Sequence, residues 1–216
     1  MGKDVKRREL FKKTGLVGLG LMAGSVAEAQ NQCRLTPRQT EGPFYPARRR
    51  NDEDNDLTIV RGQTGTPQGE IIVLRGNVKD SSCVAIGGAI VEIWQASDSG
   101  RYDHPLDDNP AELDPHFQYW GRHTTAADGS FWFKTIKPGL YPGRTRHIHM
   151  RVIADGHRTL TTQIYFTGEP RNRSDGIYRS LTPAQRALVT VDLERGEGEL
   201  HPSGSVDIIL GSTPRL

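Results

Sequence analysis

The stretch Gly139-Leu-Tyr-Pro-Gly-Arg-Thr-Arg-His-Ile-His-Met-Arg-Val-Ile153 joins a turn-rich loop to a run of branched and polar residues. We expect this run to be a β-strand, in which successive side chains point to opposite faces. Two histidines, His147 and His149, would then project from the same face, about 6.5 to 7 Å apart at the backbone. The loop before them supplies a phenol, Tyr141. Nitrogen and oxygen donors that converge in this way predict a metal site.

A second phenol, Tyr102, lies upstream in Gly100-Arg-Tyr-Asp-His104. Two tyrosines and two histidines would make a site of two oxygen and two nitrogen donors. Deprotonated phenols are hard oxygen ligands that suit a hard cation such as ferric iron. The alternative interpretation is that the histidines are an ordinary surface or core pair and that the tyrosines only pack, with satisfied hydroxyl groups.

Other short runs rich in β-branched and aromatic residues, punctuated by Gly, Pro and Asp, predict further strands. These runs are residues 70–76, 88–94, 130–135, 161–166 and 205–210. With residues 147–153 they predict an all-β protein, an immunoglobulin- or transthyretin-like β-sandwich with long irregular loops. One short helix is expected over residues 182–188, where Thr182 suits the N-cap and Pro183 the first helical position.

The charge of the chain is unevenly distributed. Its 216 residues carry 28 basic and 26 acidic side chains, a formal net charge of +2. Residues 1–29 hold six of the basic and three of the acidic groups, which leaves 22 basic and 23 acidic groups in the remainder. The body of the chain therefore has no basic excess that would favour binding to nucleic acid.

The basic N-terminus predicts an export leader. Lys6-Arg-Arg-Glu-Leu-Phe-Lys12 resembles a twin-arginine motif, and Ala27-Glu-Ala29 fits a small-residue cleavage site. The Gly-rich stretch between them is too short and too weakly apolar to span a bilayer, which takes about 20 apolar residues. We expect residues 1–29 to be a signal peptide, and the alternative is a basic amphipathic helix retained in a cytoplasmic protein. After signal removal the protein would be periplasmic or extracellular, with no membrane association.

The remaining residues, 30–216, are expected to form a single domain that holds both cysteines, Cys33 and Cys83. In an oxidising compartment an even pair favours a disulfide. Closing the loop between them would stabilise the fold by roughly 4 kcal/mol in the chain-entropy model. Two free thiols, or two thiolate ligands, are the alternatives.

Several blocks of the sequence occur in a recognisable order. They are Thr40-Glu-Gly-Pro-Phe-Tyr45, residues 94–104, Trp120-Gly-Arg122, residues 133–142, His147-Ile-His149, residues 162–170 and Asp207-Ile-Ile-Leu210. Together they resemble the intradiol ring-cleavage dioxygenases, and most of all the protocatechuate 3,4-dioxygenase branch. The resemblance runs from about residue 33 to the C-terminus and implies that residues 30–216 are a catalytic domain.

The resemblance also implies residue roles. One non-haem ferric ion, Fe(III), would be held in each chain by Tyr102, Tyr141, His147 and His149. Arg144 would be the active-site arginine, with Arg146 as its rival, and Tyr141 would act as a general base after leaving the metal. The residues implied in substrate binding are Gln163, Pro43, Tyr45 and Trp94.

The implied reaction is cleavage of a catechol-type ring, in catechol, protocatechuate or a related compound, with O2 to a cis,cis-muconate. The partners would be a small aromatic diol and O2, and the oligomeric state is left open. Gly143 stands where protocatechuate enzymes carry a tryptophan, and only five residues separate Tyr141 from His147. These departures predict a more open pocket. Two alternatives to the enzyme are a non-catalytic transthyretin-like binding module and a periplasmic metal carrier.

Overall fold

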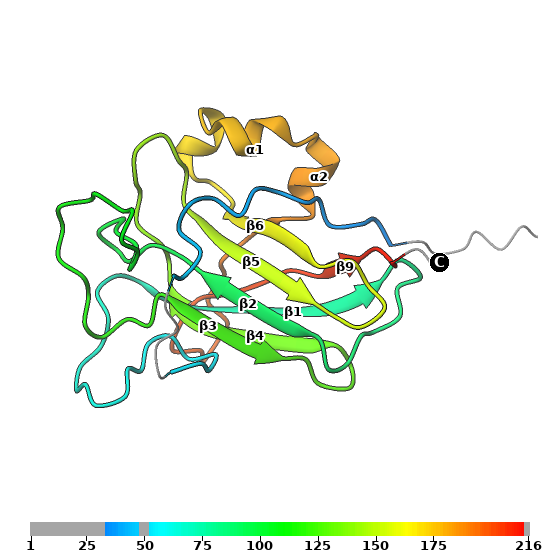
Figure 1. Ribbon diagram of the computed structural model, residues 1–216, viewed down its shortest axis with the longest axis horizontal. Helices are drawn as coiled ribbons and strands as arrows, with labels where there is room; N and C mark the ends of the chain where they lie inside the picture. Colours follow the sequence, from blue (N-terminus) through cyan, green and yellow to red (C-terminus); the bar gives the residue numbers. More distant parts are fainter. Residues whose placement is uncertain (1–32, 48–51, 214–216) are drawn as a thin grey trace, which may run out of the picture. The chain divides into compact units, whose positions relative to one another are not determined.

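Two β-sheets pack against each other in the computed structural model, which describes residues 33–47 and 52–213 (Figure 1). One sheet has the order β4-β1-β8, with β9 also paired to β1, and contains β1 (Ile71–Asp80), β4 (Ser130–Ile136), β8 (Ser203–Ser205) and β9 (Ile208–Leu210). The other has the order β3-β2-β5-β6-β7 and contains β2 (Ile90–Trp94), β3 (Trp120–Thr124), β5 (His147–Ile153), β6 (Leu160–Phe166) and β7 (Thr190–Val191). The predicted all-β sandwich is confirmed.

The core lies between the sheets and follows the alternation of the strands. In β5, Ile148, Met150 and Val152 are completely buried and belong to the main hydrophobic cluster. Ile72 and Leu74 of β1 meet them from the other sheet and are also completely buried. Because every second residue of β5 points into this core, His147 and His149 lie on the opposite, outer face of the five-stranded sheet.

The last predicted strand, residues 205–210, is two strands in the structure. β8 pairs with β1 at Val73–Arg75 and β9 pairs with β1 at Val78–Asp80, so the chain bends between them. The carbonyl of Val206 approaches β1 so closely at the bend that a Cβ on Gly76 would lie 1.9 Å from its oxygen. Gly76 therefore makes the bend sterically feasible.

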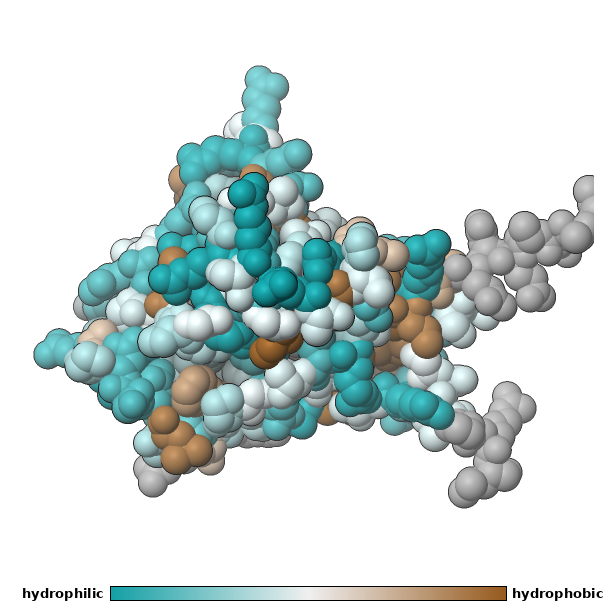
Figure 2. Space-filling view, turned by 90° about the horizontal axis from the view of Figure 1, so that it is seen from above, coloured by the Kyte–Doolittle hydropathy of each residue, from teal (hydrophilic) through white to brown (hydrophobic). Residues whose placement is uncertain are grey.

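Two short helices are present where one was expected. α2 (Pro183–Ala187) lies within the predicted range and begins with a capping box made by Thr182 and Gln185. The additional helix is α1 (Gly176–Ser180), preceded by a 3-10 turn (Pro170–Arg173). Neither α1 nor α2 contains a fully buried residue, and Figure 2, seen from above, shows a mostly hydrophilic surface with small, separate hydrophobic patches.

The segment 33–47, blue in Figure 1, runs along the edge of the five-stranded sheet beside β6. The backbone N–H of Gln39 donates to the carbonyl of Thr161 at 2.9 Å. The predicted disulfide between Cys33 and Cys83 is present, with 5.2 Å between the two Cα atoms. It anchors the start of this segment to the chain just beyond β1.

The expected leader, residues 1–29, lies outside the described residues. The described part of the chain belongs to one compact unit, Asn31–Leu216. Within residues 33–47 and 52–213, no helix has the length and apolar character needed to cross a membrane.

Candidate metal centre

The outer face of the five-stranded sheet carries a row of large side chains at matched positions. In the register of the strands, His149 of β5 lies between Trp94 of β2 and Gln163 of β6. His147 lies opposite Tyr165 of β6. Loops cover this face, so that His147 and His149 are each only 2% exposed although they point away from the sandwich core.

The structure brings the four predicted metal-binding residues together. The Tyr141 hydroxyl lies 3.1 Å from His147 Nε2, and His147 Nε2 lies 3.2 Å from His149 Nε2. Tyr102 closes the group, with its ring centroid 5.5 Å from that of Tyr141 and 6.2 Å from that of His149. Three donor atoms from a loop and a strand thus crowd one small volume, with a fourth aromatic donor beside them.

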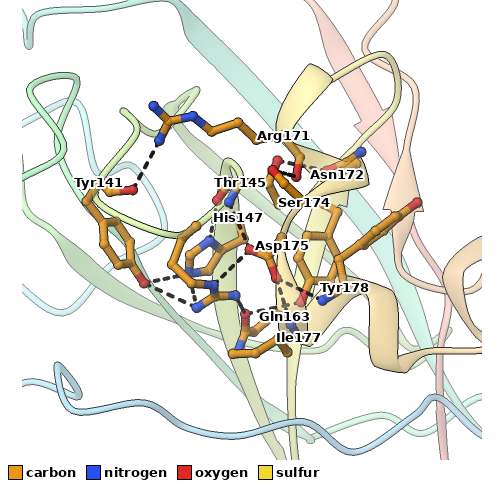
Figure 3. Close-up of polar contacts among 12 residues, drawn as sticks. Tyr141, Thr145, His147, Gln163, Arg171, Asn172, Ser174, Asp175, Ile177 and Tyr178 are labelled. Atoms are coloured by element: carbon orange, nitrogen blue, oxygen red, sulfur yellow. Dashed lines mark hydrogen bonds and ion pairs between the residues drawn. The ribbon is translucent and has the colours of Figure 1, made fainter.

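The protonation state of His147 follows from its neighbours. His147 Nδ1 donates to the backbone carbonyl of Thr145 at 2.7 Å, so the lone pair of the neutral ring is on Nε2. Burial, and then the positive charge of Arg144, lower the pKa of His147 to about 3. The ring is therefore neutral at ordinary pH, and its lone pair points toward the Tyr141 hydroxyl (Figure 3). His149 Nε2 lies on the same side of the ring, 3.2 Å from His147 Nε2.

His149 is held by stacking. Burial, followed by His147 and Arg144, lowers its pKa well below the ordinary value. Its Nδ1 has no hydrogen-bond partner among the described residues. Instead, its ring lies nearly parallel to that of Trp94, with 4.9 Å between centroids and 9° between planes. On the loop 33–47, Gly42 (φ +72°) comes so close that a Cβ there would lie 3.3 Å from His149 Cε1.

The two phenols are neutral in the protein alone. Burial raises the pKa of Tyr102 well above its ordinary value, and the nearby phenol of Tyr141 raises it further. Burial also raises the pKa of Tyr141, although Arg144 opposes this effect. The Tyr102 hydroxyl is buried and makes no hydrogen bond of acceptable geometry within the described part of the chain. A bound cation would supply the field that both phenolates need, so this donor set fits a hard metal ion.

None of the four candidate donors is a carboxylate. No cluster of three or more His, Cys, Asp or Glu side chains that could hold a metal occurs in the described ranges. The site has two histidines, and its other two donors are tyrosines. That composition differs from the sites of Ca²⁺ and Mg²⁺, which use carboxylate and carbonyl oxygens.

Of the two candidate active-site arginines, Arg144 and Arg146, only Arg144 contacts the candidate metal-binding residues. Its Nη1 lies 3.2 Å from the Tyr141 hydroxyl and 3.3 Å from His147 Nε2, and its Nη2 donates to Gln163 Oε1 at 2.5 Å. Arg146 instead donates to the Pro138 carbonyl and pairs with Glu169 at 3.4 Å. The structure therefore places only Arg144 against the candidate donors.

Asp175, which the sequence analysis missed, anchors Arg144. Its carboxylate accepts from Arg144 Nε and from the Thr145 N–H, both at 2.8 Å, and from the N–H groups of Ile177 and Tyr178, both at 2.9 Å (Figure 3). Burial alone would raise the pKa of Asp175, but these donors hold it below its ordinary value. An Asp just before a helix start was the available sequence signal.

A cavity of about 740 Å³ opens beside these residues. Tyr141 and Arg144 line it, as does Pro43, one of the four residues predicted to bind substrate. Gln163 is completely buried behind Arg144, and its amide nitrogen donates to the Thr40 carbonyl at 2.9 Å.

The other two predicted pocket residues lie farther back. Tyr45 donates its hydroxyl to Glu92 at 3.0 Å, and the guanidinium of Arg151 lies 4.5 Å from its ring centroid. Trp94 is 1% exposed and lies behind His149. Neither Tyr45 nor Trp94 is among the described residues that line the cavity.

Residues 40–211 match the family model described as Dioxygenase. The chain is 40% identical over 158 residues to the protocatechuate 3,4-dioxygenase beta chain of Burkholderia cepacia, an alignment that covers 69% of this chain and 67% of that protein. It is 28% identical over 197 residues to catechol 1,2-dioxygenase of Candida albicans, covering 81% of this chain and 61% of that protein. The chain thus spans about two thirds of the length of these two relatives.

A solved structure shares the fold. It is the dioxygenase domain of a dioxygenase and carbohydrate-binding protein fusion from Streptomyces sp. SirexAA-E. The two chains are 33% identical and superpose with a TM-score of 0.65, over 83% of this chain and 100% of the other. The similarity therefore extends across nearly the whole described part of the chain.

Proposed function

The chain belongs to the intradiol ring-cleavage dioxygenase family, and on that premise we propose that it binds one non-haem Fe(III) ion and cleaves catechol-type rings with O2. Both oxygen atoms of O2 would enter the product, as the bond between the two hydroxyl-bearing carbons breaks to give a cis,cis-muconate. The substrate would be catechol, protocatechuate or a related diol. We propose Tyr102, Tyr141, His147 and His149 as the metal ligands.

The observation that carries this proposal is the convergence of the Tyr141 hydroxyl and the two histidine Nε2 atoms. The Tyr141 hydroxyl lies 3.1 Å from His147 Nε2, which lies 3.2 Å from His149 Nε2, and the buried phenol of Tyr102 lies beside Tyr141. Buried polar atoms normally have well-formed hydrogen bonds, so two buried phenols crowded against two neutral imidazoles, with no hydrogen bond of good geometry to the Tyr102 hydroxyl, require an explanation. A cation bound by all four side chains would explain why two phenols and two neutral imidazoles are buried together.

When bound, ferric iron would act as a Lewis acid that makes a chelated catechol reactive toward O2. The two phenols are not equivalent in this chemistry. Tyr141 lines the cavity, whereas Tyr102 is 3% exposed and does not. We therefore propose that Tyr141 Oη meets the substrate and accepts a proton from the incoming diol.

Arg144 and Gln163 complete the site electrostatically. The guanidinium of Arg144 lies against the Tyr141 hydroxyl, so its positive charge is available where negative charge develops on the ring. Gln163 accepts from Arg144 and limits its movement. Asp175 holds the same guanidinium from the other side.

Purified protein should be loaded with Fe(III) and assayed for iron content, visible absorption and O2 uptake with catechol. We expect one iron per chain, a burgundy colour from tyrosinate-to-iron charge transfer, and O2 uptake matched by muconate absorbance. Tyr141→Phe should retain iron, shift the visible band and lose turnover. A matched control is Tyr178→Phe, since Tyr178 lies beyond Tyr165 and contacts none of the four proposed ligands directly.

Other outcomes would reassign the protein. A colourless preparation that stays iron-free and inactive after ferric loading would support the non-catalytic binding module. A protein that binds copper and turns blue, with no reaction toward any catechol, would support the metal carrier. Either result would contradict the dioxygenase.

We also propose that the protein is exported by the twin-arginine route and works in the periplasm or outside the cell. The motif around Arg7 and Arg8 supports this, and the Cys33–Cys83 disulfide fits an oxidising compartment. Replacement of both arginines by lysine should retain the precursor in the cytoplasm. Export of the double variant at the normal rate, measured by fractionation, would contradict the proposal.

A further inference from the structure

The cavity beside Tyr141 and Arg144 has an unusual charge distribution. Two carboxylates, Asp107 and Asp108, line it, and Arg144 is the only cationic side chain among its described lining residues. We infer that this cavity selects catechols whose ring substituent is uncharged or cationic and discriminates against carboxylated catechols. The inference rests on the proposed function, because it concerns the substrate of that same site.

Arg144 is not available to a substrate carboxylate. Asp175 compensates its charge at 2.8 Å, and further contacts to Gln163 and to the Tyr141 hydroxyl occupy both terminal nitrogens. These contacts direct the guanidinium toward the end of the cavity where the two diol oxygens would bind. A carboxylate on the far side of the ring would therefore meet no cation among the described residues that line the cavity.

Among the described residues, Arg171 also lies near Tyr141, but it contacts the backbone of Tyr141 and not its hydroxyl end. Its guanidinium donates to the backbone carbonyl of Tyr141 at 3.3 Å. Figure 3 shows this contact on the side of Tyr141 opposite its hydroxyl group. Arg171 is not among the residues that line the cavity.

The two carboxylates have different tasks. Asp107 accepts from the N–H groups of Tyr102 at 2.6 Å and Asn109 at 3.0 Å, so it helps to fix the backbone of a proposed ligand. Asp108 is exposed and has no hydrogen bond or ion pair within the described ranges. Its charge therefore faces whatever enters, and would repel an anionic substituent and attract a cationic one.

The rest of the lining suits an uncharged ring. Five of the lining residues are apolar, namely Pro43, Phe44, Pro110, Pro142 and Ile177. Phe44 stacks near Tyr102, with 4.7 Å between ring centroids, and so extends an apolar wall toward the proposed metal. An apolar wall with the Asp108 carboxylate at its border favours a neutral substituent over a carboxylate, for which the described lining offers no uncompensated positive charge.

The test compares 3,4-dihydroxybenzoate with 3,4-dihydroxybenzamide, which has nearly the same shape and no charge. With the iron-loaded full chain at low salt, we expect kcat/KM for the amide to exceed that for the acid by about tenfold. Asp108→Asn should reduce this ratio severalfold, because it removes the charge and keeps the size. The control Asp155→Asn, an exposed residue in the turn between β5 and β6, should leave the ratio unchanged.

Equal or better use of the acid by the wild type, or an unchanged ratio in Asp108→Asn, would overturn the inference. If no catechol is cleaved, the proposed function fails, and the charge inference is then decided by calorimetric binding of the same two compounds without O2. The acid should again bind about tenfold more weakly, and equal dissociation constants would overturn the inference. A 4-(2-aminoethyl)catechol cation should bind at least as well as the amide.

Discussion

The inner and outer faces of the five-stranded sheet bury different kinds of side chain, although the same strands form both faces. On the inner face of β5, Ile148, Met150 and Val152 are completely buried among other apolar side chains. On the outer face, His147 and His149 are almost as deeply buried but among phenols, amides and an arginine. Burial on the inner face stabilises the fold, whereas burial of polar groups on the outer face costs stability unless each finds a partner.

This difference predicts that substitutions one residue apart in β5 will fail in different ways. The largest effect is expected from His149→Ala, which removes a proposed ligand and leaves the inner face intact. We expect loss of most bound iron, loss of the visible band, and a fall in kcat/KM of at least about a hundredfold, with unfolding still cooperative. Metal analysis, absorption and thermal melting measure these.

Unchanged iron content in His149→Ala would remove this histidine from the proposed site. Iron loading of the variant in the presence of added imidazole gives a sharper check, since free imidazole fits the space left by the side chain. Partial recovery of the visible band would show that the nitrogen, and not the packing of the ring, is what the metal needs.

The neighbouring substitution Ile148→Ala should show the opposite behaviour. It opens a hole in the core and is expected to lower the free energy of unfolding by about 3 kcal/mol, with Ile148→Val costing about 1 kcal/mol. Below the melting temperature, iron content and the visible band should be those of the wild type. A variant that loses iron while its stability is unchanged would contradict the division between the two faces.

The proposed site also depends on a residue from outside the sheet. Asp175→Asn keeps an oxygen that can cap α1 but removes the charge that holds Arg144. We expect iron to be retained and kcat to fall about tenfold, because the guanidinium loses its fixed position. Asp175→Ala should in addition lower stability by about 1 kcal/mol through loss of the cap. If Asp175→Asn has the same kcat as the wild type, Asp175 only supports the helix.

The same carboxylate gives a pH signature. Its pKa in the folded protein is below the ordinary value of 3.8, so its charged form stabilises the fold above that pH. This contribution is lost as the pH falls through the folded pKa. Acid unfolding of Asp175→Asn should therefore lack part of the pH dependence seen in the wild type below pH 3.8, which chemical denaturation at several pH values can measure.

The sequence predicted the faces of the central strand well because alternation is a local property. Residues 147–153 were expected as a strand and form one with these bounds, and the same period puts both histidines on one face. β3, Trp120–Thr124, was missed because Gly121 and the polar residues Arg122 and His123 interrupt its pattern. Its pairing with β2 gives it a strand conformation that its own residues do not favour.

Parts of the site that depend on contacts distant in sequence could not be predicted in this way. Asp175 meets Arg144 across 31 residues, and the loop with Asp107 and Asp108 meets segment 33–47 around the cavity. Neither contact has a periodic or spacing signal. Family resemblance supplied Arg144 and its rival Arg146, and the tertiary structure was needed to separate them.

The smallest effect is expected from the aromatic support of His149. Trp94 lies parallel to that ring at 4.9 Å, and His149 Nδ1 has no hydrogen-bond partner among the described residues that would fix the ring instead. Trp94→Phe keeps an aromatic face but loses about half of its extent. We expect iron to remain bound, the visible band to shift slightly, and kcat to fall about threefold.

The matched control is Trp132→Phe, on β4 of the other sheet, where the indole is 44% exposed. This control should leave the visible band and kcat unchanged. If Trp94→Phe lowers only the melting temperature, with band and turnover equal to those of the control, Trp94 is a packing residue. The orientation of His149 would then depend on the proposed metal and on its other neighbours, His147, Tyr102 and Gly42, and not on the indole.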